Sequence, residues 1–162
     1  DLSISASYSP QQAAAAASMA YGLTYTGVEG LTVSYGMGDA ETGVSSTEAD
    51  QTVMSASYAY GSFTIAYSEN DYASAVAASD QEMTSYKLSY TVSDEISVSY
   101  GSEEITLEGD TDTAEFDKIS ASYTSGGMTV TAGMSESANG AHDSTSNIDD
   151  RDYWSLGLSF AF

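Results

Sequence analysis

The sequence is short of several residue types, and each shortage excludes a class of protein or site. Its 162 residues include no cysteine, one proline and only three lysine and arginine residues. Disulfide bonds and thiolate metal sites are therefore excluded. Nucleic acid is excluded as a partner, because phosphate binding needs basic patches. No run of about 18 or more apolar residues occurs, so no transmembrane helix is predicted.

Acidic and aromatic residues, by contrast, are plentiful. Asp and Glu number 24, which gives a formal net charge of -21. Acidity of this kind indicates disorder where aromatic residues are few, but this chain has 13 tyrosines, four phenylalanines and one tryptophan. The length suits one domain, so we expect residues 1–162 to form a single β-barrel domain or the carboxyl-terminal part of one. No signal peptide is visible at Asp1, and we expect a processed protein or part of a longer chain.

An internal repeat organises the chain. Alternating apolar runs begin at residues 31, 63, 96 and 128, a spacing of 32 or 33 residues. Each run follows a short turn, at 29–30, 61–62, 94–95 and 126–127, and each turn follows a second alternating run, at 19–26, 54–60, 86–92 and 118–124. Such a unit is a β-hairpin, and the turn residues suit two-residue loops. Longer segments are predicted as loops at 39–51, 70–82, 103–117 and 136–151.

Adding strands at 2–8 and 154–162 gives about ten antiparallel strands, each with two different faces. One face is apolar, rich in tyrosine and free of charge over these runs, as a lipid-facing surface requires. The other face is mostly Ser, Thr, Gly and Ala. The pattern predicts an all-β, antiparallel transmembrane β-barrel. Its predicted pore-lining residues are Lys87, Lys118, Ser34, Ser57, Ser89, Ser99, Ser122 and Thr131.

The closing strand carries the most specific pattern. Its apolar positions alternate with small residues and are Trp154, Leu156, Leu158, Phe160 and Phe162. This segment resembles the closing strand of bacterial outer-membrane β-barrels. In that family such a terminal strand, with its final phenylalanine, is the assembly signal read by the barrel-insertion machinery, and the resemblance assigns this role to these five residues.

The hairpin repeat, the hydroxyl-rich face, the acidic loops and Phe162 together resemble Gram-negative porins of the α-proteobacterial type, specifically their carboxyl-terminal portion. The resemblance implies location in the outer membrane, contact with its lipid and lipopolysaccharide, a homotrimer, and a barrel of about sixteen strands. It also implies an inward-folded constriction loop, which this chain is expected to lack. A barrel of about eight strands is already filled by side chains, and the small residues here suit a wider, wet lumen. We therefore expect part of a larger porin.

The function expected on this basis is passive diffusion of ions and small hydrophilic solutes. Cation selectivity is predicted from acids expected around the outer mouth: Glu41, Glu48, Asp50, Glu103, Glu104, Glu108, Asp110, Asp112 and Asp117. Two alternatives stay open from the sequence. One is a small closed outer-membrane barrel acting as anchor, adhesin or surface receptor. The other is a soluble or fibrous surface β-protein, although its solvent face would normally be rich in charge.

Residues that could carry catalysis are scarce. The single histidine, His142, lies in a Gly/Ser/Asn-rich segment, and no serine has a nucleophile motif with a base in reach. We therefore expect no enzyme activity and no resident cofactor. Divalent cations at the acidic outer loops are the one metal hypothesis, with Asp110, Asp112, Asp149 and Asp150 as candidates, but these lack the spacing of a calcium loop. A short helical turn is expected at 11–17.

Overall fold

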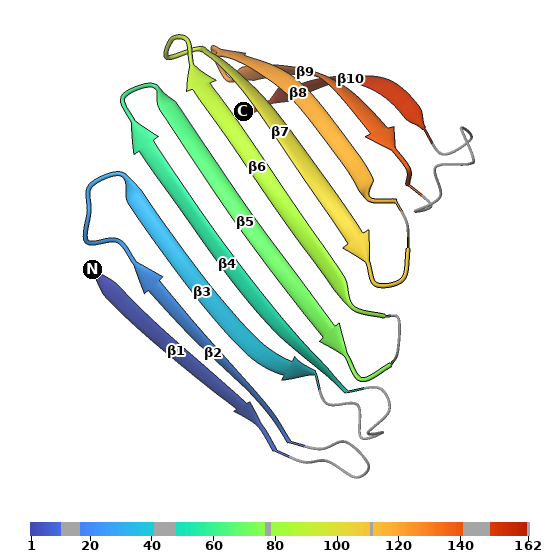
Figure 1. Cartoon of the computed structure of the whole chain (residues 1–162). Helices are drawn as coiled ribbons and strands as arrows, with labels where there is room; N and C mark the ends of the chain where they lie inside the picture. The colour runs from blue at the N-terminus through green and yellow to red at the C-terminus, as the bar shows by residue number, and fades with distance from the viewer. Residues whose placement is uncertain (11–16, 41–47, 77–78, 111, 141–149, 162) are drawn as a thin grey trace.

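The computed structural model describes residues 1–10, 17–40, 48–76, 79–110, 112–140 and 150–161. Ten strands form one antiparallel sheet in which each strand pairs with its neighbours in sequence (Figure 1). Their bounds are β1 Leu2–Ser9, β2 Ser18–Tyr25, β3 Leu31–Ala40, β4 Ala49–Tyr60, β5 Phe63–Ser74, β6 Gln81–Thr91, β7 Ile96–Leu107, β8 Ala114–Ser125, β9 Met128–Ala138 and β10 Arg151–Phe160. This confirms the predicted all-β fold and the predicted number of strands. In the described part of the chain, no helix is long and apolar enough to cross a membrane.

The short turns lie together at one end of the sheet, and the longer connections lie at the other (Figure 1). Two-residue turns are found at 61–62 and 126–127, where Gly61 and Gly126 both have a φ of 57°. The connections between Tyr25 and Leu31 and between Thr91 and Ile96 are longer, so the prediction of uniform two-residue loops was wrong there. The amino-terminal residue, Asp1, also lies at the turn end. Its carbonyl accepts a hydrogen bond from the Thr26 amide at 2.7 Å.

The sheet has no second layer in the described residues, and its two edge strands, β1 and β10, are not paired with each other. Among the residues whose burial is described, only Ala49 and Ala114 are buried, with 6% and 2% of their surface exposed. Large apolar side chains are exposed instead, as at Ile4 (74%) and Trp154 (77%). We call this single-layer sheet the wall. Because its apolar side chains are uncovered, its apolar face requires an apolar environment.

The strands are staggered regularly. A cross-strand row joins Leu31, Tyr58, Ile65, Leu88, Tyr100, Ile119, Met134 and Trp154. Measured from this row, β3, β5, β7 and β9 begin 0, 2, 4 and 6 residues nearer the turn end. Two residues of slip for every two strands correspond to a strand tilt of roughly 35° at ordinary strand spacings. A tilt of this size is what a closed barrel requires.

Candidate functional site: the two faces of the wall

Hydroxyl groups cover the polar face of the sheet in cross-strand pairs. The Ser97 and Ser122 hydroxyls are 2.8 Å apart, as are those of Ser99 and Ser120. On β2 and β3, Thr24 and Ser34 form a further pair at 3.1 Å. Alternation along each strand places all the predicted pore-lining serines and Thr131 on this face. Their part in conduction remains a prediction.

The structure brings the two predicted pore-lining lysines into one row. Lys87 on β6 and Lys118 on β8 both lie opposite Gly101 of β7, one on each side. The Lys118 stem leans toward β9, where its Cε is 3.7 Å from the position that a side chain on Gly133 would occupy. Within the described residues, no hydrogen bond or ion pair holds either ammonium group. Neither charge is neutralised by a neighbouring side chain of the described residues.

A third cation, Arg151, was missed by the sequence reasoning. Arg151 is the first residue of β10 and pairs with Ser137 of β9. Because side chains alternate along a strand, Arg151 lies on the same face as Ser155, which is the polar face. It was missed because residues 136–151 were read as a loop. The three lysine and arginine residues of the whole chain thus lie on the same face. Glu103 is the single acid of the described strands on that face, and it accepts a hydrogen bond from the Ser85 hydroxyl at 3.1 Å.

The expectation that the acids lie in the loops was wrong for many of them. Strands β3 to β10 extend into all four segments that were assigned to loops, because acidic residues pair in the ladder despite their poor strand preference. Of the predicted mouth acids, Asp50, Glu104 and Asp117 lie on the apolar face and Glu103 on the polar face. Those in the connections are Glu48, Glu108, Asp110 and Asp112. Glu41 lies outside the described residues.

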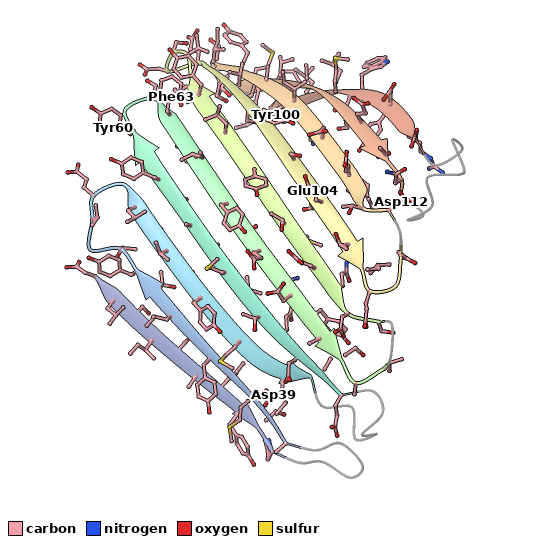
Figure 2. All side chains as sticks on the ribbon, in the orientation of Figure 1. Asp39, Tyr60, Phe63, Tyr100, Glu104 and Asp112 are labelled. Carbon is pink, nitrogen blue, oxygen red and sulfur yellow. The ribbon has the colours of Figure 1, made fainter. Side chains whose placement is uncertain are left out.

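The outer end of the apolar face therefore carries charge, beyond the runs for which an uncharged face was predicted. Four outer hairpins, all except β1–β2, have one directly opposed acidic pair each: Asp39 with Asp50, Asp71 with Glu82, Glu104 with Glu115, and Glu136 with Asp152. Opposed like charges are destabilising, and charged side chains are costly in hydrocarbon. This row of acid pairs must therefore lie outside the apolar core of a membrane. Figure 2 shows the side chains on the sheet, with Asp39 and Glu104 labelled.

The acid pairs follow the stagger of the strands. From the cross-strand row through Tyr58 and Trp154, Asp50 is eight residues away, Glu82 six, Glu115 four and Asp152 two. The acidic row and the turns consequently run parallel, with an apolar band between them. Along β10 the eight residues from Asp152 to Phe160 rise roughly 22 Å along the membrane normal at a 35° tilt. This is close to the apolar band of about 25 Å in transmembrane barrels.

The polar face changes character at the same height. Beyond the lysine row its side chains are mixed, and the apolar ones are Val53, Tyr72, Met83, Ile105, Leu107 and Phe116. Polar residues, among them Gln51, Asn70 and Gln81, lie between them. The two buried residues, Ala49 and Ala114, also have this parity. At the outer end the membrane-side face thus carries charge, and the inner face carries apolar groups beside polar ones.

The closing strand has the predicted register. Trp154, Leu156, Leu158 and Phe160 share the apolar face, opposite Met134, Ala132, Val130 and Met128 of β9. The Ala161 amide donates to the Gly127 carbonyl at 2.7 Å, so the chain end stays paired at the turn end. Phe162, the last residue of the predicted assembly signal, lies outside the described residues.

No catalytic or metal site can be built from the described residues. They contain no group of three or more His, Asp or Glu side chains placed to hold a metal ion. His142 and Asp149 lie outside the described part of the chain, as does most of the expected helical turn at 11–17. Asp150 accepts a hydrogen bond from the Asn139 amide at 3.2 Å, which is a loop contact.

Comparison with known proteins identifies the family to which the chain belongs. A family model described as Gram-negative porin matches residues 1–123. The chain belongs to the Gram-negative porin family. The fold is similar to that of a mutant of the Rhodobacter blastica porin, with a TM-score of 0.62 and 16% sequence identity. That match covers 90% of this chain and 46% of the other, so the chain spans about half the length of that porin. No curated protein sequence matches.

Membership in this family settles several of the expectations. Gram-negative porins are outer-membrane channel proteins, so the chain is an outer-membrane protein in contact with the lipid of that membrane. The prediction that it is not an enzyme agrees with the family. The open ten-stranded sheet is consistent with part of a porin barrel. The acidic row lies at the end with the long connections, which in transmembrane barrels is the extracellular end.

Proposed function

We propose that this chain forms part of the wall of a water-filled channel through which ions and small hydrophilic solutes diffuse passively. The observation that carries the proposal is the hydroxyl lattice on one face, backed by an apolar face on the same strands. Hydroxyl groups exchange hydrogen bonds with water at little cost, so hydrated solutes can pass without being held. Neither a bound catalyst nor a conformational step is needed.

The test is single-channel recording of the full-length assembly in planar bilayers. The proposal expects stepwise, ohmic conductance that scales with bulk salt, as a wet lumen does. Correctly folded protein that leaves the bilayer sealed would overturn it. We also propose that this chain is a portion of a larger barrel. A mature gene product with an intact mass near the 16.9 kDa of this chain would contradict that.

We propose cation selectivity, with the field set by the net charge of -21 and opposed locally by the lysine row. Replacing both lysines, Lys87→Glu with Lys118→Glu, should shift the reversal potential in a salt gradient toward the Nernst potential of the cation. The shift should shrink at high salt, because the Debye length falls from about 10 Å at 0.1 M to about 3 Å at 1 M. The control is Glu104→Gln with Glu115→Gln, which changes charge on the opposite face. The control removes negative charge, so any shift it causes should be small and in the opposite direction. A shift per unit of changed charge as large as that of the lysine variants would contradict a local role for the lysines.

The remaining partners are part of the same proposal. We propose a homotrimer, contacts with the lipopolysaccharide of the outer membrane, and recognition of the closing strand by the barrel-insertion machinery. Deleting Phe162 should slow assembly while leaving the β10 register intact, because the other apolar residues of β10 keep their partners on β9. Heat-modifiable mobility of the protein in isolated outer membranes measures this. Assembly at the unmodified rate and yield would show that the terminus has no such role.

A further inference from the structure

A groove crosses the apolar face at β8, β9 and β10. Ala121 and Ala132 lie directly opposite each other on β8 and β9, and their small side chains leave a hollow among larger ones. The hollow has a volume of about 410 Å³, and its walls are formed by Val98, Ile119, Met134, Trp154 and Leu156. All five share the apolar parity, so the hollow opens toward lipid.

A second hollow continues the first toward the outer end. Its volume is about 480 Å³, and it shares Ile119, Met134 and Trp154 with the lower one. Its upper border is acidic, because Asp117, Glu136 and Asp152 are consecutive cross-strand partners there. Lys118 belongs to its floor, since alternation turns the lysine side chain to the opposite face.

The two hollows therefore form one groove that is apolar below and negatively charged above. Both are within the size range of about 300–1,000 Å³ for small-molecule sites. Tyr100 donates a hydrogen bond to Asp117 at 2.5 Å. In the described residues, Glu136 and Asp152 have no hydrogen-bond or ion-pair partner, and no lysine or arginine shares their face.

We propose that this groove binds a membrane lipid whose headgroup carries a primary amine, with an acyl chain in the lower hollow and the ammonium at Glu136 and Asp152. Charge complementarity selects this occupant, because an anionic headgroup would be repelled by three successive carboxylates. The proposal rests on the membrane placement of the apolar face and is independent of whether the polar face conducts.

Trp154 makes the proposal measurable, because it is the only tryptophan of the chain and lines both hollows. The full-length protein is reconstituted in phosphatidylcholine vesicles that contain brominated phosphatidylethanolamine or brominated phosphatidylglycerol at equal mole fraction. Quenching of Trp154 fluorescence reports the lipid in the groove. A Trp154→Phe variant supplies the background from the rest of the protein. We expect the amine lipid to quench about two- to fivefold more effectively than the anionic lipid, because a surface ion pair changes a binding constant by about this factor.

Two pairs of variants separate groove binding from general effects on folding. Glu136→Gln with Asp152→Asn should abolish the headgroup preference, whereas Asp71→Asn with Glu82→Gln, an equivalent pair on another hairpin, should retain it. Ala132→Leu should fill the lower hollow and reduce quenching by both lipids. Its control is Ala56→Leu, a lipid-facing alanine of β4 outside the groove.

Equal quenching by the two lipids would overturn the proposal. So would a preference for the anionic lipid that depends on added Ca²⁺, because that result assigns the acids to a bridging metal. Protection of Trp154 from every brominated lipid would mean that a second copy of the chain covers the groove. Single-channel conductance of the same variants should be unchanged, so failure here is distinguishable from failure of the channel proposal.

Discussion

The two faces of strand β6 show most directly which two environments the sheet separates. Tyr86, Leu88 and Tyr90 project to one side, while Lys87, Ser89 and Thr91 project to the other. Both sets of side chains come from the same strand, lie at the same level of the sheet and have the same neighbouring strands. The contrast between them is therefore explained by the medium that each face meets. One medium excludes charge and accepts aromatic rings, and the other accepts lysine and hydroxyl groups. Lipid outside and water inside fit both sides of the strand.

At the outer end of the sheet this contrast is lost. There acids lie on the membrane-side face, and apolar residues such as Met83 and Ile105 lie among polar ones on the inner face. A face therefore has no fixed polarity along the whole strand. Its polarity changes where the surrounding medium changes, and the row of opposed acid pairs marks that height.

The largest expected effect comes from charge at the centre of the apolar band. Leu156 lies midway between Asp152 and Phe160 on β10, opposite Ala132 of β9. Leu156→Arg should reduce the free energy of folding into a bilayer by about 2–4 kcal/mol, the cost of arginine facing the membrane centre. Its neighbour Ser155 lies opposite Gly133 on the other face, and Ser155→Arg should cost far less. Reversible urea titration in lipid vesicles measures both, and equal losses would break the comparison.

A smaller effect is expected from the aromatic pair near the turns. The rings of Phe63 and Tyr90 are stacked, with centroids 4.5 Å apart. Phe63→Ala should reduce the free energy of folding by about 1 kcal/mol, since such pairs contribute roughly 0.5–1.5 kcal/mol. Thr64→Ala, one residue along on the polar face, is the matched control in the same titration. A control loss as large as that of Phe63→Ala would show that the stacked rings add nothing at this border.

The smallest effect is expected from the hydroxyl pairs. A double-mutant cycle on Ser99→Ala and Ser120→Ala should give a coupling energy of about 0.5 kcal/mol or less, because water in the lumen replaces the lost partner. The paired hydroxyls are 2.8 Å apart, so the geometry itself is favourable. A coupling well above about 1.5 kcal/mol would indicate a dry interior. A small, filled barrel would then be favoured over a channel.

Much of this organisation could be predicted from local sequence. The 32- or 33-residue repeat, the parity of Leu88 against Ser89, and the register of Trp154 to Phe160 depend only on alternation within a strand. Strand ends were harder to predict, because acids such as Asp71 and Glu104 are typical of loops, yet here they pair within the ladder. Two features depend on cross-strand register, which one sequence does not specify. These are the opposition of Glu136 and Asp152, and the approach of Lys87 and Lys118 to Gly101.

The absence of cysteine from the chain allows a direct test of the central claim, that water lies on one face and lipid on the other. Single cysteines are introduced at adjacent positions of three strands: Ala56 and Ser57, Leu88 and Ser89, and Val98 and Ser99. The folded full-length protein in vesicles is then treated with a membrane-impermeant, water-soluble thiol reagent. The account predicts rapid labelling at 57, 89 and 99 and protection at 56, 88 and 98. Equal labelling at both parities, or labelling confined to the apolar parity, would contradict it.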